Sequence, residues 1–359
     1  MKLFDVVGDA VRRDRGGVAP DSGDDARPRH AFGWPTVIGG LAVGGMALGI
    51  ASNWPGFAAA GLNVTQALWL LPGLVALHLG QLFLAGVAWR TLFVGSRPGV
   101  VAFYRLRVIR EGIDSLLPVA QVGGEIVGAR LLSQRGVRMG QAAASVIVDV
   151  TVELLTQVAF LAAGLCALAW LSRNGAWGGA WGTWIKATLA GMTLAASLIL
   201  AQRFGLLRAL EALLRGMARR WPTLAGASLD GVHAAALDFY RQPAALVRSA
   251  GLHLLAWTLG SVETWAILHA FSLPATPLQA FTVESLGMAA RSAGFAIPAA
   301  LGAQEGGFVL AAAAIGVPVA PALALSLVKR LRECLVGLVG LALWRTAVSR
   351  PASPCPASW

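Results

Sequence analysis

Apolar residues form long, nearly uninterrupted stretches along this chain, with most polar residues gathered between them. A helix needs roughly 20 apolar residues to cross the hydrocarbon core of a bilayer. The stretches that reach or approach this length predict an all-α polytopic membrane protein with about six full spans. They are 37–52, which Phe32 to Pro35 can extend, 66–89, 141–171, 183–201, 244–271 and 321–344.

Arginine and lysine are concentrated on one side of these spans. They cluster in the N-terminal tail, in 90–110, in 130–138 and in 203–248, whereas 53–65 and 172–182 are poor in basic residues. Basic loops stay on the cytoplasmic side of a membrane. The distribution therefore predicts a multi-pass protein of the bacterial inner (cytoplasmic) membrane with a cytoplasmic N-terminus.

Two further apolar regions, 100–134 and 276–317, are broken by proline, glycine and charged residues. The orientations of the flanking spans require 100–134 to enter and leave on the cytoplasmic face, and 276–317 on the outer face. Pro118 and Pro298 lie at the expected turns, where the missing N–H and the proline ring end a helix. We therefore expect two broken, re-entrant helical hairpins that enter from opposite faces.

The two halves of the chain match at a fixed offset of 180 residues. Acidic residues are rare in membrane segments, so matched acids are a stronger signal than matched alanines or leucines. With hairpins of opposite orientation, the match predicts an inverted-topology repeat, an arrangement common in secondary transporters. A structural duplication without transport is the alternative. The expected units are about 66–171 and 244–344, and the matched residues are Pro118 with Pro298, Glu125 with Glu305, and Glu153 with Glu333.

Charged residues inside the last span of each unit form the first candidate site. They are Asp149 and Glu153 in the first unit, and Lys329, Arg330, Arg332 and Glu333 in the second. An isolated charge at the bilayer centre costs at least about 2.5–3.5 kcal/mol, so these side chains should pair or face a polar cavity. The plausible pairs are Asp149 with Lys329, and Glu153 with Arg330 or Arg332. The residues form either a structural ion-pair network or a site for a headgroup or proton.

Glycine and glutamate lie together near each expected hairpin break. These residues are Gly123, Gly124 and Glu125 in the first hairpin, and Glu305, Gly306 and Gly307 in the second. Such a glutamate either binds a cation or lipid headgroup, or caps the free N–H groups of a helix start. Arg291 is the best single candidate for binding an anion, because a guanidinium binds phosphate bidentately. It could equally be the partner of Glu305.

Composition excludes several other classes of protein. The chain has 359 residues, 13% of them charged, and a formal net charge of +11. Soluble proteins usually carry about a quarter charged residues. Because the basic residues flank apolar spans, they indicate membrane orientation rather than nucleic-acid binding. Cysteine and histidine show no metal-ligand spacing and no nucleotide-binding motif is present, so we expect neither a metal nor a cofactor.

A single transmembrane domain, 33–345, is expected between polar ends. Residues 1–32 lack the apolar core of a signal peptide and should form a disordered cytoplasmic tail. Residues 346–359 should form a second, short tail. Between the two units, 203–243 combines arginine with leucine and is expected to be a basic amphipathic segment on the cytoplasmic leaflet.

Three segments resemble a known family: SLLPVAQVGGEIVGARLL, IPAALGAQEGGFVLAAAAIGV and ALSLVKRLRECLVGLVG. Over about residues 35–345 the chain is similar to the transmembrane region of lysylphosphatidylglycerol synthases and related flippase-like proteins. Within that group it looks most like the branch associated with hopanoid biosynthesis. The resemblance implies a bacterial inner-membrane protein that moves or presents lipids. In the synthases a soluble aminoacyl-transferase domain follows, and we expect no such domain in this sequence.

These observations favour an inner-membrane lipid translocase or lipid-transport component, for hopanoids or related lipids, with a charged cavity between the two units. Membrane lipids and lipid-biosynthesis enzymes are the expected partners. One alternative is an intramembrane lipid-modifying enzyme with Asp149 and Glu153 as acid and base, although the sequence contains no nucleophile–base or metal constellation. The other is a non-catalytic scaffold for lipid-synthesis enzymes.

Overall fold

All regular secondary structure in the described part of the chain is helical, which confirms the expected all-α class. The computed structural model describes residues 54–93, 98–117, 123–172, 231–294 and 300–349. The elements are α3 (Trp54–Ala67), a 3₁₀ turn η1 (Leu68–Leu70), α4 (Leu71–Thr91), α5 (Val100–Leu116), α6 (Gly123–Ser133), α7 (Met139–Ser172), α10 (Val232–Tyr240), α11 (Pro243–Ala270), α12 (Pro277–Ala293), α13 (Ala303–Ala313) and α14 (Val319–Ser349).

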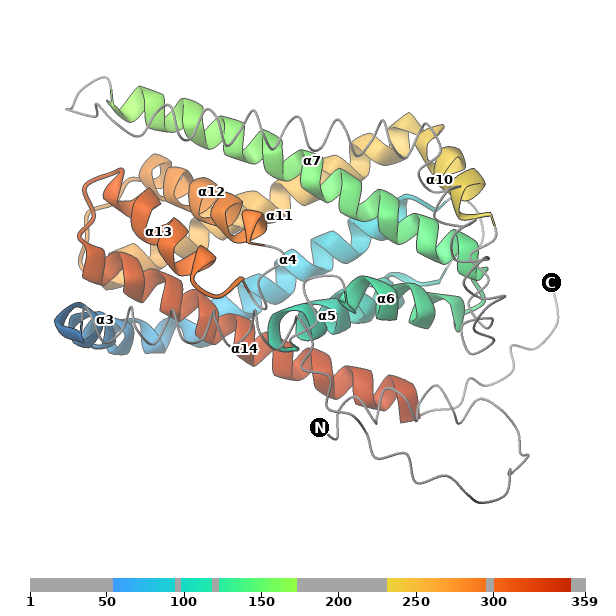
Figure 1. Cartoon of the computed structure of the whole chain (residues 1–359), viewed down its shortest axis with the longest axis horizontal. Coiled ribbons are helices and arrows are strands. Elements are labelled where there is room, and N and C mark those ends of the chain that lie inside the picture. Colours follow the sequence, from blue (N-terminus) through green and yellow to red (C-terminus); the bar gives the residue numbers. More distant parts are fainter. Residues whose placement is uncertain (1–53, 94–97, 118–122, 173–230, 295–299, 350–359) are drawn as a thin grey trace, which may run out of the picture.

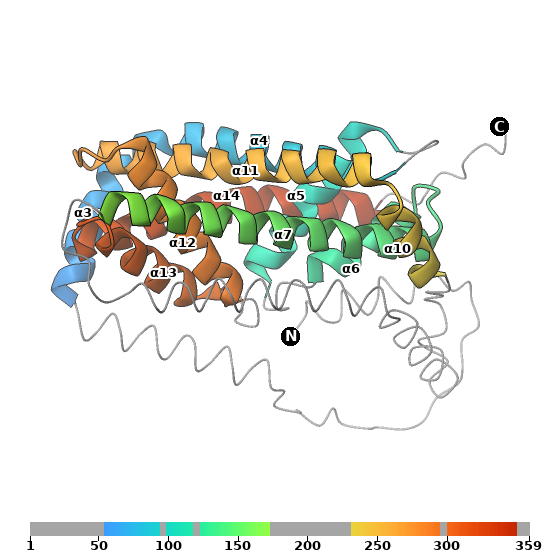
Figure 2. The same ribbon diagram turned by 90° about the horizontal axis from the view of Figure 1, so that it is seen from above.

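Four long helices, α4, α7, α11 and α14, run along the long axis of the molecule (Figure 1, Figure 2). Two stretches, Asn63–Thr91 and Met139–Leu171, are long and apolar enough to cross a membrane. The 34 residues of α7 extend over roughly 50 Å at 1.5 Å per residue, more than the thickness of a hydrocarbon core. The helices α11 and α14 coincide with the expected spans 244–271 and 321–344.

Several expected features fall outside the described residues. These are the spans 37–52 and 183–201, the tail 1–32, most of the tail 346–359, most of the amphipathic segment 203–243, and both hairpin prolines, Pro118 and Pro298.

Two pairs of shorter helices lie in opposite halves of the molecule. In Figure 1, α5 and α6 lie in the half that holds α10, and α12 and α13 lie in the half that holds α3. In each pair the first helix has 17 residues and the second has 11. Helices α6 and α13 begin 180 residues apart. The glycines that follow them, Gly136 and Gly316, both adopt the left-handed conformation, with φ of 88° and 81°.

The packing of helices follows the same scheme in both halves of the chain. Helix α5 packs along α14, α12 packs along α7, and α4 packs along α11. The first helix of each pair of shorter helices, α5 or α12, therefore lies against the last long helix of the other half of the chain. The two sets of helices, α4 to α7 and α11 to α14, interlock instead of forming two separate bundles.

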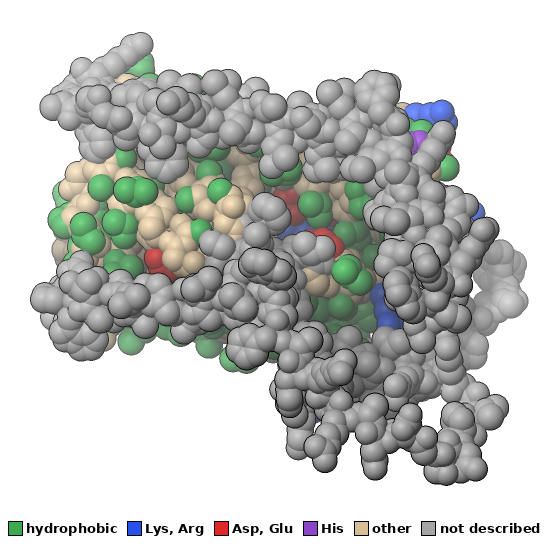
Figure 3. Space-filling view, viewed as in Figure 1, with side chains coloured by type: hydrophobic (Ala, Val, Ile, Leu, Met, Phe, Trp, Pro, Cys, Tyr) green, Lys and Arg blue, Asp and Glu red, His purple; other side chains and the backbone are tan. Residues whose placement is uncertain are grey.

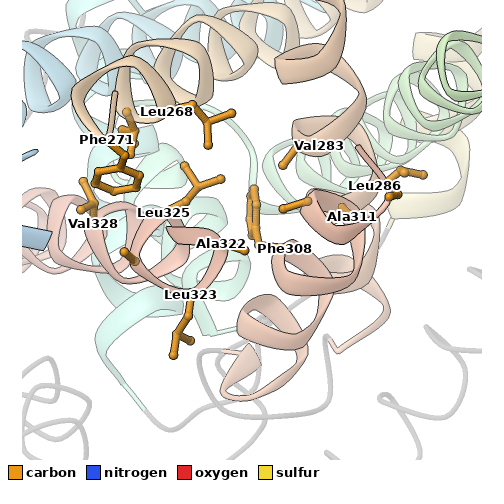
Figure 4. Packing of buried hydrophobic residues seen from close by; sticks show 14 of the residues in the cluster. Leu268, Phe271, Val283, Leu286, Phe308, Ala311, Ala322, Leu323, Leu325 and Val328 are labelled. Atoms are coloured by element: carbon orange, nitrogen blue, oxygen red, sulfur yellow. The ribbon is translucent and has the colours of Figure 1, made fainter. Parts of the chain in front are cut away.

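Apolar side chains form two main clusters, which lie in different halves along the long axis. One surrounds Phe308, whose ring lies among side chains of α12, α13 and α14 (Figure 4). The other contains Trp89 and Phe103, whose rings meet edge to face with centroids 5.0 Å apart. Large apolar side chains such as Trp69 and Val247 remain exposed on the outer surface. Exposed apolar surface of this kind is typical of contact with a membrane.

Glycine allows α5 and α14 to touch backbone to backbone. A Cβ added at Gly112 would lie 2.6 Å from the carbonyl oxygen of Gly337. The crossing of α12 with α7 is built differently at the positions 180 residues away, which hold Ser292 and Gln157. There the Gln157 side-chain amide donates a hydrogen bond to Ser292 Oγ at 2.5 Å. One crossing is thus held by close backbone packing and the other by side-chain hydrogen bonds.

The glycine crossing generates a stability prediction. Gly112→Ala is expected to lower the free energy of unfolding by about 1–3 kcal/mol, because the new methyl group meets the backbone of α14 and overpacks the crossing. The matched control is Gly251→Ala on α11, where nothing lies within 4 Å of the added Cβ. Alanine favours a helix over glycine, so the control should be neutral or slightly stabilising. Equal melting temperatures for the two variants in one detergent would contradict the close crossing.

Candidate functional site

Charged side chains gather between the two apolar clusters. On α7, Asp149 and Glu153 flank Val152, where one cluster ends, and the other cluster begins at Leu161. Figure 3 shows acidic and basic side chains near the middle of the molecular face, among hydrophobic ones. Ion pairs and hydrogen bonds sort them into two networks. The first network is His78, Arg107, Arg110, Glu111, Asp114, Glu125, Asp149, Glu153 and His253; the second network is Glu263, Glu284, Arg291, Gln304, Glu305, Lys329, Arg330, Arg332 and Glu333.

Asp149, on α7, is the centre of the first network and is fully buried. Its Oδ2 accepts a hydrogen bond from Arg110 at 3.1 Å and lies 3.5 Å from Arg107. Its Oδ1 lies 3.2 Å from His253 Nε2. One carboxylate therefore joins α5, α7 and α11 through charge-assisted hydrogen bonds, which are stronger than neutral ones.

The two arginines extend the first network to less buried carboxylates. Arg110 donates to Glu125 Oε1 at 2.6 Å, and Arg107 forms an ion pair with Glu153. The side chains of Glu125 and Glu153 are 23% and 22% exposed, whereas that of Asp149 is fully buried. The network thus runs from a buried centre to an edge at which carboxylates remain accessible.

Asp114 fits against the start of α6. The Gly124 N–H donates to its Oδ1 at 2.8 Å. A Cβ at Gly124 would lie 2.4 Å from Asp114 Oδ2, so only glycine leaves room for this carboxyl group. The Asp114 carboxyl group also lies within hydrogen-bonding reach of Glu125. Gly123, expected at the hairpin break, is the first residue of α6.

His78 brings α4 into the first network. Its Nδ1 lies 2.8 Å from Gln81 Oε1, and its Nε2 lies 3.7 Å from Glu111 Oε1. Glu111 is also close enough to Arg291 for their charges to interact, and Arg291 belongs to the second network. Glu111 therefore links the two halves electrostatically.

Glu263, in α11, is the centre of the second network and is fully buried. Its Oε2 accepts a hydrogen bond from Lys329 at 3.3 Å and forms an ion pair with Arg332. Lys329 also lies 2.9 Å from Glu284, whose Oε2 accepts a hydrogen bond from Thr264 at 2.5 Å. Lys329 is thus held between carboxylates from two neighbouring helices, α11 and α12.

Arg291, the sequence's best candidate for binding an anion, is already paired with a carboxylate. It forms an ion pair with Glu333 and donates to Gln304 Oε1 at 3.1 Å. Glu333 lies in addition 3.2 Å from Arg332 and 3.4 Å from Arg330. An anionic ligand at Arg291 would have to compete with this carboxylate.

Glu305 caps the start of α13. Its Oε2 accepts a hydrogen bond from the Gly302 N–H at 2.7 Å, and its Oε1 lies 2.9 Å from Arg330. The chain turns into α13 at Gly302, whose φ is 82°. Gly306 and Gly307, expected at the break, instead lie inside α13. Of the two roles considered for Glu305, the geometry supports capping.

The ion pairs expected from the sequence are wrong in their partners. The expected pairs are Asp149 with Lys329, Glu153 with Arg330 or Arg332, and Arg291 with Glu305. Among the described residues, each of these side chains pairs with other groups. The physical reason is that α5 brings arginines to α7, and α11 brings a glutamate to α14. The repeat offset compares α7 with α14 and contains no information about those neighbours.

Nine members of the networks were not among the predicted site residues: His78, Arg107, Arg110, Glu111, Asp114, His253, Glu263, Glu284 and Gln304. Glu263 carries a signal that could have found it, because it is an acid near the middle of an apolar stretch. Arg107 is one of several basic residues in 90–110, and all of them are interpreted as a sign of membrane orientation. The two histidines lie in long apolar helices, and nothing in their spacing links them to an acid.

Most carboxylates of the two networks contact cationic side chains. Among the described residues, no set of three or more His, Cys, Asp and Glu side chains could hold a metal ion. Asp149 and Glu153, the acid–base pair of the enzyme alternative, both contact Arg107. Both carboxylates are therefore held in ion pairs with the same guanidinium group.

Comparison with known proteins identifies one family. Residues 37–340 match the family described as the lysylphosphatidylglycerol synthase transmembrane region. The matched range covers both networks and both pairs of short helices. No curated protein and no solved structure matches the chain.

The two glutamates Glu263 and Glu305 are expected to differ in their contribution to stability. Glu263→Gln leaves Lys329 and Arg332 short of a counter-charge in a buried site, and breaking such a network costs about 3–5 kcal/mol. Glu305→Gln retains an oxygen that can accept the capping hydrogen bond, so we expect a loss of about 1 kcal/mol. Thermal unfolding of both variants in one detergent measures the difference. Similar losses would show that the second network does not stabilise the fold as its burial indicates.

Proposed function

We propose a function for this chain on the basis of its family, because it belongs to the lysylphosphatidylglycerol synthase transmembrane-region family of membrane proteins. Its function is to move lipid between leaflets, as a translocase or a component of a lipid-transport system, in the bacterial inner membrane. The lipid is a hopanoid or a related lipid. The observation that supports this most directly is the layer of charge between two apolar clusters.

Such a layer suits a lipid whose polar end must cross the bilayer. The headgroup would pass along polar side chains between the two halves, while the acyl or polycyclic part remains in the surrounding lipid. Glu125 and Glu153 are the best candidates to contact the headgroup, because they are charged and still partly exposed. The buried centres of the networks, Asp149 and Glu263, would hold the helices together during this passage.

We propose that the two halves form an inverted-topology repeat, with the N-terminus in the cytoplasm. Supporting observations are the equal lengths of the short helices, the matched starts of α6 and α13, and the reciprocal packing of α5 on α14 and α12 on α7. The short pairs also lie in opposite halves of the molecule (Figure 1). In this interpretation they are re-entrant hairpins, and lipid binds between the two repeats, which is where other inverted-repeat transporters bind their substrates.

The proposed topology is tested by labelling single cysteines in a variant from which Cys166, Cys334 and Cys355 have been removed. A cysteine at Gln134 should react from the cytoplasmic side, because it follows the first hairpin. A cysteine at Thr276 or Pro318, which flank the second hairpin, should react from the periplasmic side. All three positions are exposed. Reaction of Gln134→Cys and Pro318→Cys from the same side would contradict the inverted repeat.

The translocase function is tested with Glu125→Gln in proteoliposomes. The amide removes the charge with little change of shape, so the protein should remain folded while leaflet exchange of a fluorescent lipid slows by about tenfold, or ~1.4 kcal/mol. Asp238→Asn is the matched control, because Asp238 is an exposed acid on α10 outside both networks. It should leave the rate unchanged.

Melting temperature and lipid exchange are measured on the same preparation, so that loss of fold and loss of function are separated. If wild-type protein moves no lipid of any headgroup class under any ion gradient, the translocase proposal fails. The scaffold for lipid-synthesis enzymes would then be the better interpretation.

A further inference from the structure

The two networks differ in their balance of permanent charge. The second network contains four carboxylates and four cationic side chains, so it is neutral as a whole. The first network contains five carboxylates but two arginines, together with two histidines. With both histidines neutral and all carboxyl groups ionised, the described residues of the first network therefore carry three more negative than positive charges.

An imbalance of this size is unfavourable at membrane depth. Each isolated charge in the hydrocarbon region costs at least about 2.5–3.5 kcal/mol, and the cost is avoided by pairing or by taking up a proton. The link from Glu111 to Arg291 does not remove the deficit, because the second network uses its own cations fully. A metal ion is not favoured, because the described residues contain no suitable set of ligands.

The first network contains three places where a proton would supply the missing charge. The first is His253, which is buried and lies 3.2 Å from Asp149. Arg110 and Arg107 face the same carboxylate from α5, so a proton on the imidazole completes a cluster of opposite charges.

The second place is His78. With Nδ1 donating to Gln81 Oε1, a neutral imidazole turns the lone pair of Nε2 toward the Glu111 carboxylate, 3.7 Å away. Nε2 has no hydrogen-bond partner in the described structure. A proton on Nε2 converts this unfavourable contact into an ion pair. Glu263, which faces His78 from α11, would also be attracted to the protonated imidazole.

The third place is the carboxyl pair Asp114 and Glu125. Two carboxylates within hydrogen-bonding reach repel each other, and a shared proton turns the repulsion into a hydrogen bond. Arg110, which pairs with Glu125, is the cation that faces them, and the Gly124 N–H already fixes Asp114 Oδ1. Three protons, one at each place, bring the first network to neutrality.

We infer that the first network is a proton-binding site, filled and emptied at His78, His253 and the Asp114–Glu125 pair. Because the second network is already neutral, proton uptake changes the charge of one half of the molecule relative to the other. Resting on the proposed lipid translocase, the inference further identifies protons as the ions that drive lipid movement. No other reactant is needed, since the protons come from water on one side and return to water on the other.

Proton binding is tested directly by infrared spectroscopy of the full-length protein in lipid, between about pH 5 and pH 8. Wild-type protein should show the carbonyl stretch of a buried, protonated carboxyl group. That band should disappear in Asp114→Asn and in Glu125→Gln, and remain in the control Asp238→Asn. Two variants are used so that misfolding of one does not decide the result. A wild-type spectrum without the band at any pH in this range would overturn the proton site.

Coupling is tested in proteoliposomes with an imposed pH gradient and, separately, a sodium gradient. A gradient of one pH unit should bias the leaflet distribution of lipid by about tenfold for each proton coupled, and a sodium gradient should have no effect. His78→Gln and His253→Gln should weaken the response to pH. Lipid movement that ignores the pH gradient would overturn the coupling while leaving the translocase intact. An infrared band in protein that moves no lipid would retain the proton site and overturn the translocase.

Discussion

The free-energy cost of a charge in hydrocarbon is the constraint on which the rest of this structure depends. Fifteen Asp, Glu, Lys and Arg side chains lie in the two networks, and each is placed where a partner from another element reaches it. Asp149 and Glu263 therefore do more than pair with one base. They set the positions of α5, α7, α11 and α14 relative to one another, because breaking these contacts would leave a charge unpaired.

The two halves use the same order of helices for different electrostatic purposes. In the second half, Lys329 is enclosed by carboxylates and Glu305 caps a helix, so its charges serve mainly the fold. In the first half, the carboxylates outnumber the cations, and Glu125 and Glu153 reach an accessible edge. The charges of one half thus mainly stabilise the bundle, whereas those of the other half include carboxylates that remain accessible.

The sequence was sufficient to predict the features that depend on local composition. The apolar stretches gave the long helices, and the 180-residue offset anticipated the matched starts of α6 and α13. Half of the network residues were also predicted, but their partners were not. A partner depends on how α5 and α11 rotate and cross, so Arg107 and Glu263 could not be assigned to Asp149 and Lys329 from spacing. The need for glycine at Gly124 likewise appears only when Asp114 is seen beside it.

The crossing of α5 with α14 and the crossing of α12 with α7 are built from different contacts, and this difference affects where the molecule can bend. At Gly112 the backbone of α5 already touches the backbone of α14 at Gly337 and Gly340, so these two helices have little room to shift against each other. At Gln157 and Ser292 the helices are joined by a side-chain hydrogen bond, which can break and re-form with water or a ligand. If the two halves move relative to each other, α5 and α14 would stay in contact at the glycines, and α7 and α12 would separate at Gln157 and Ser292.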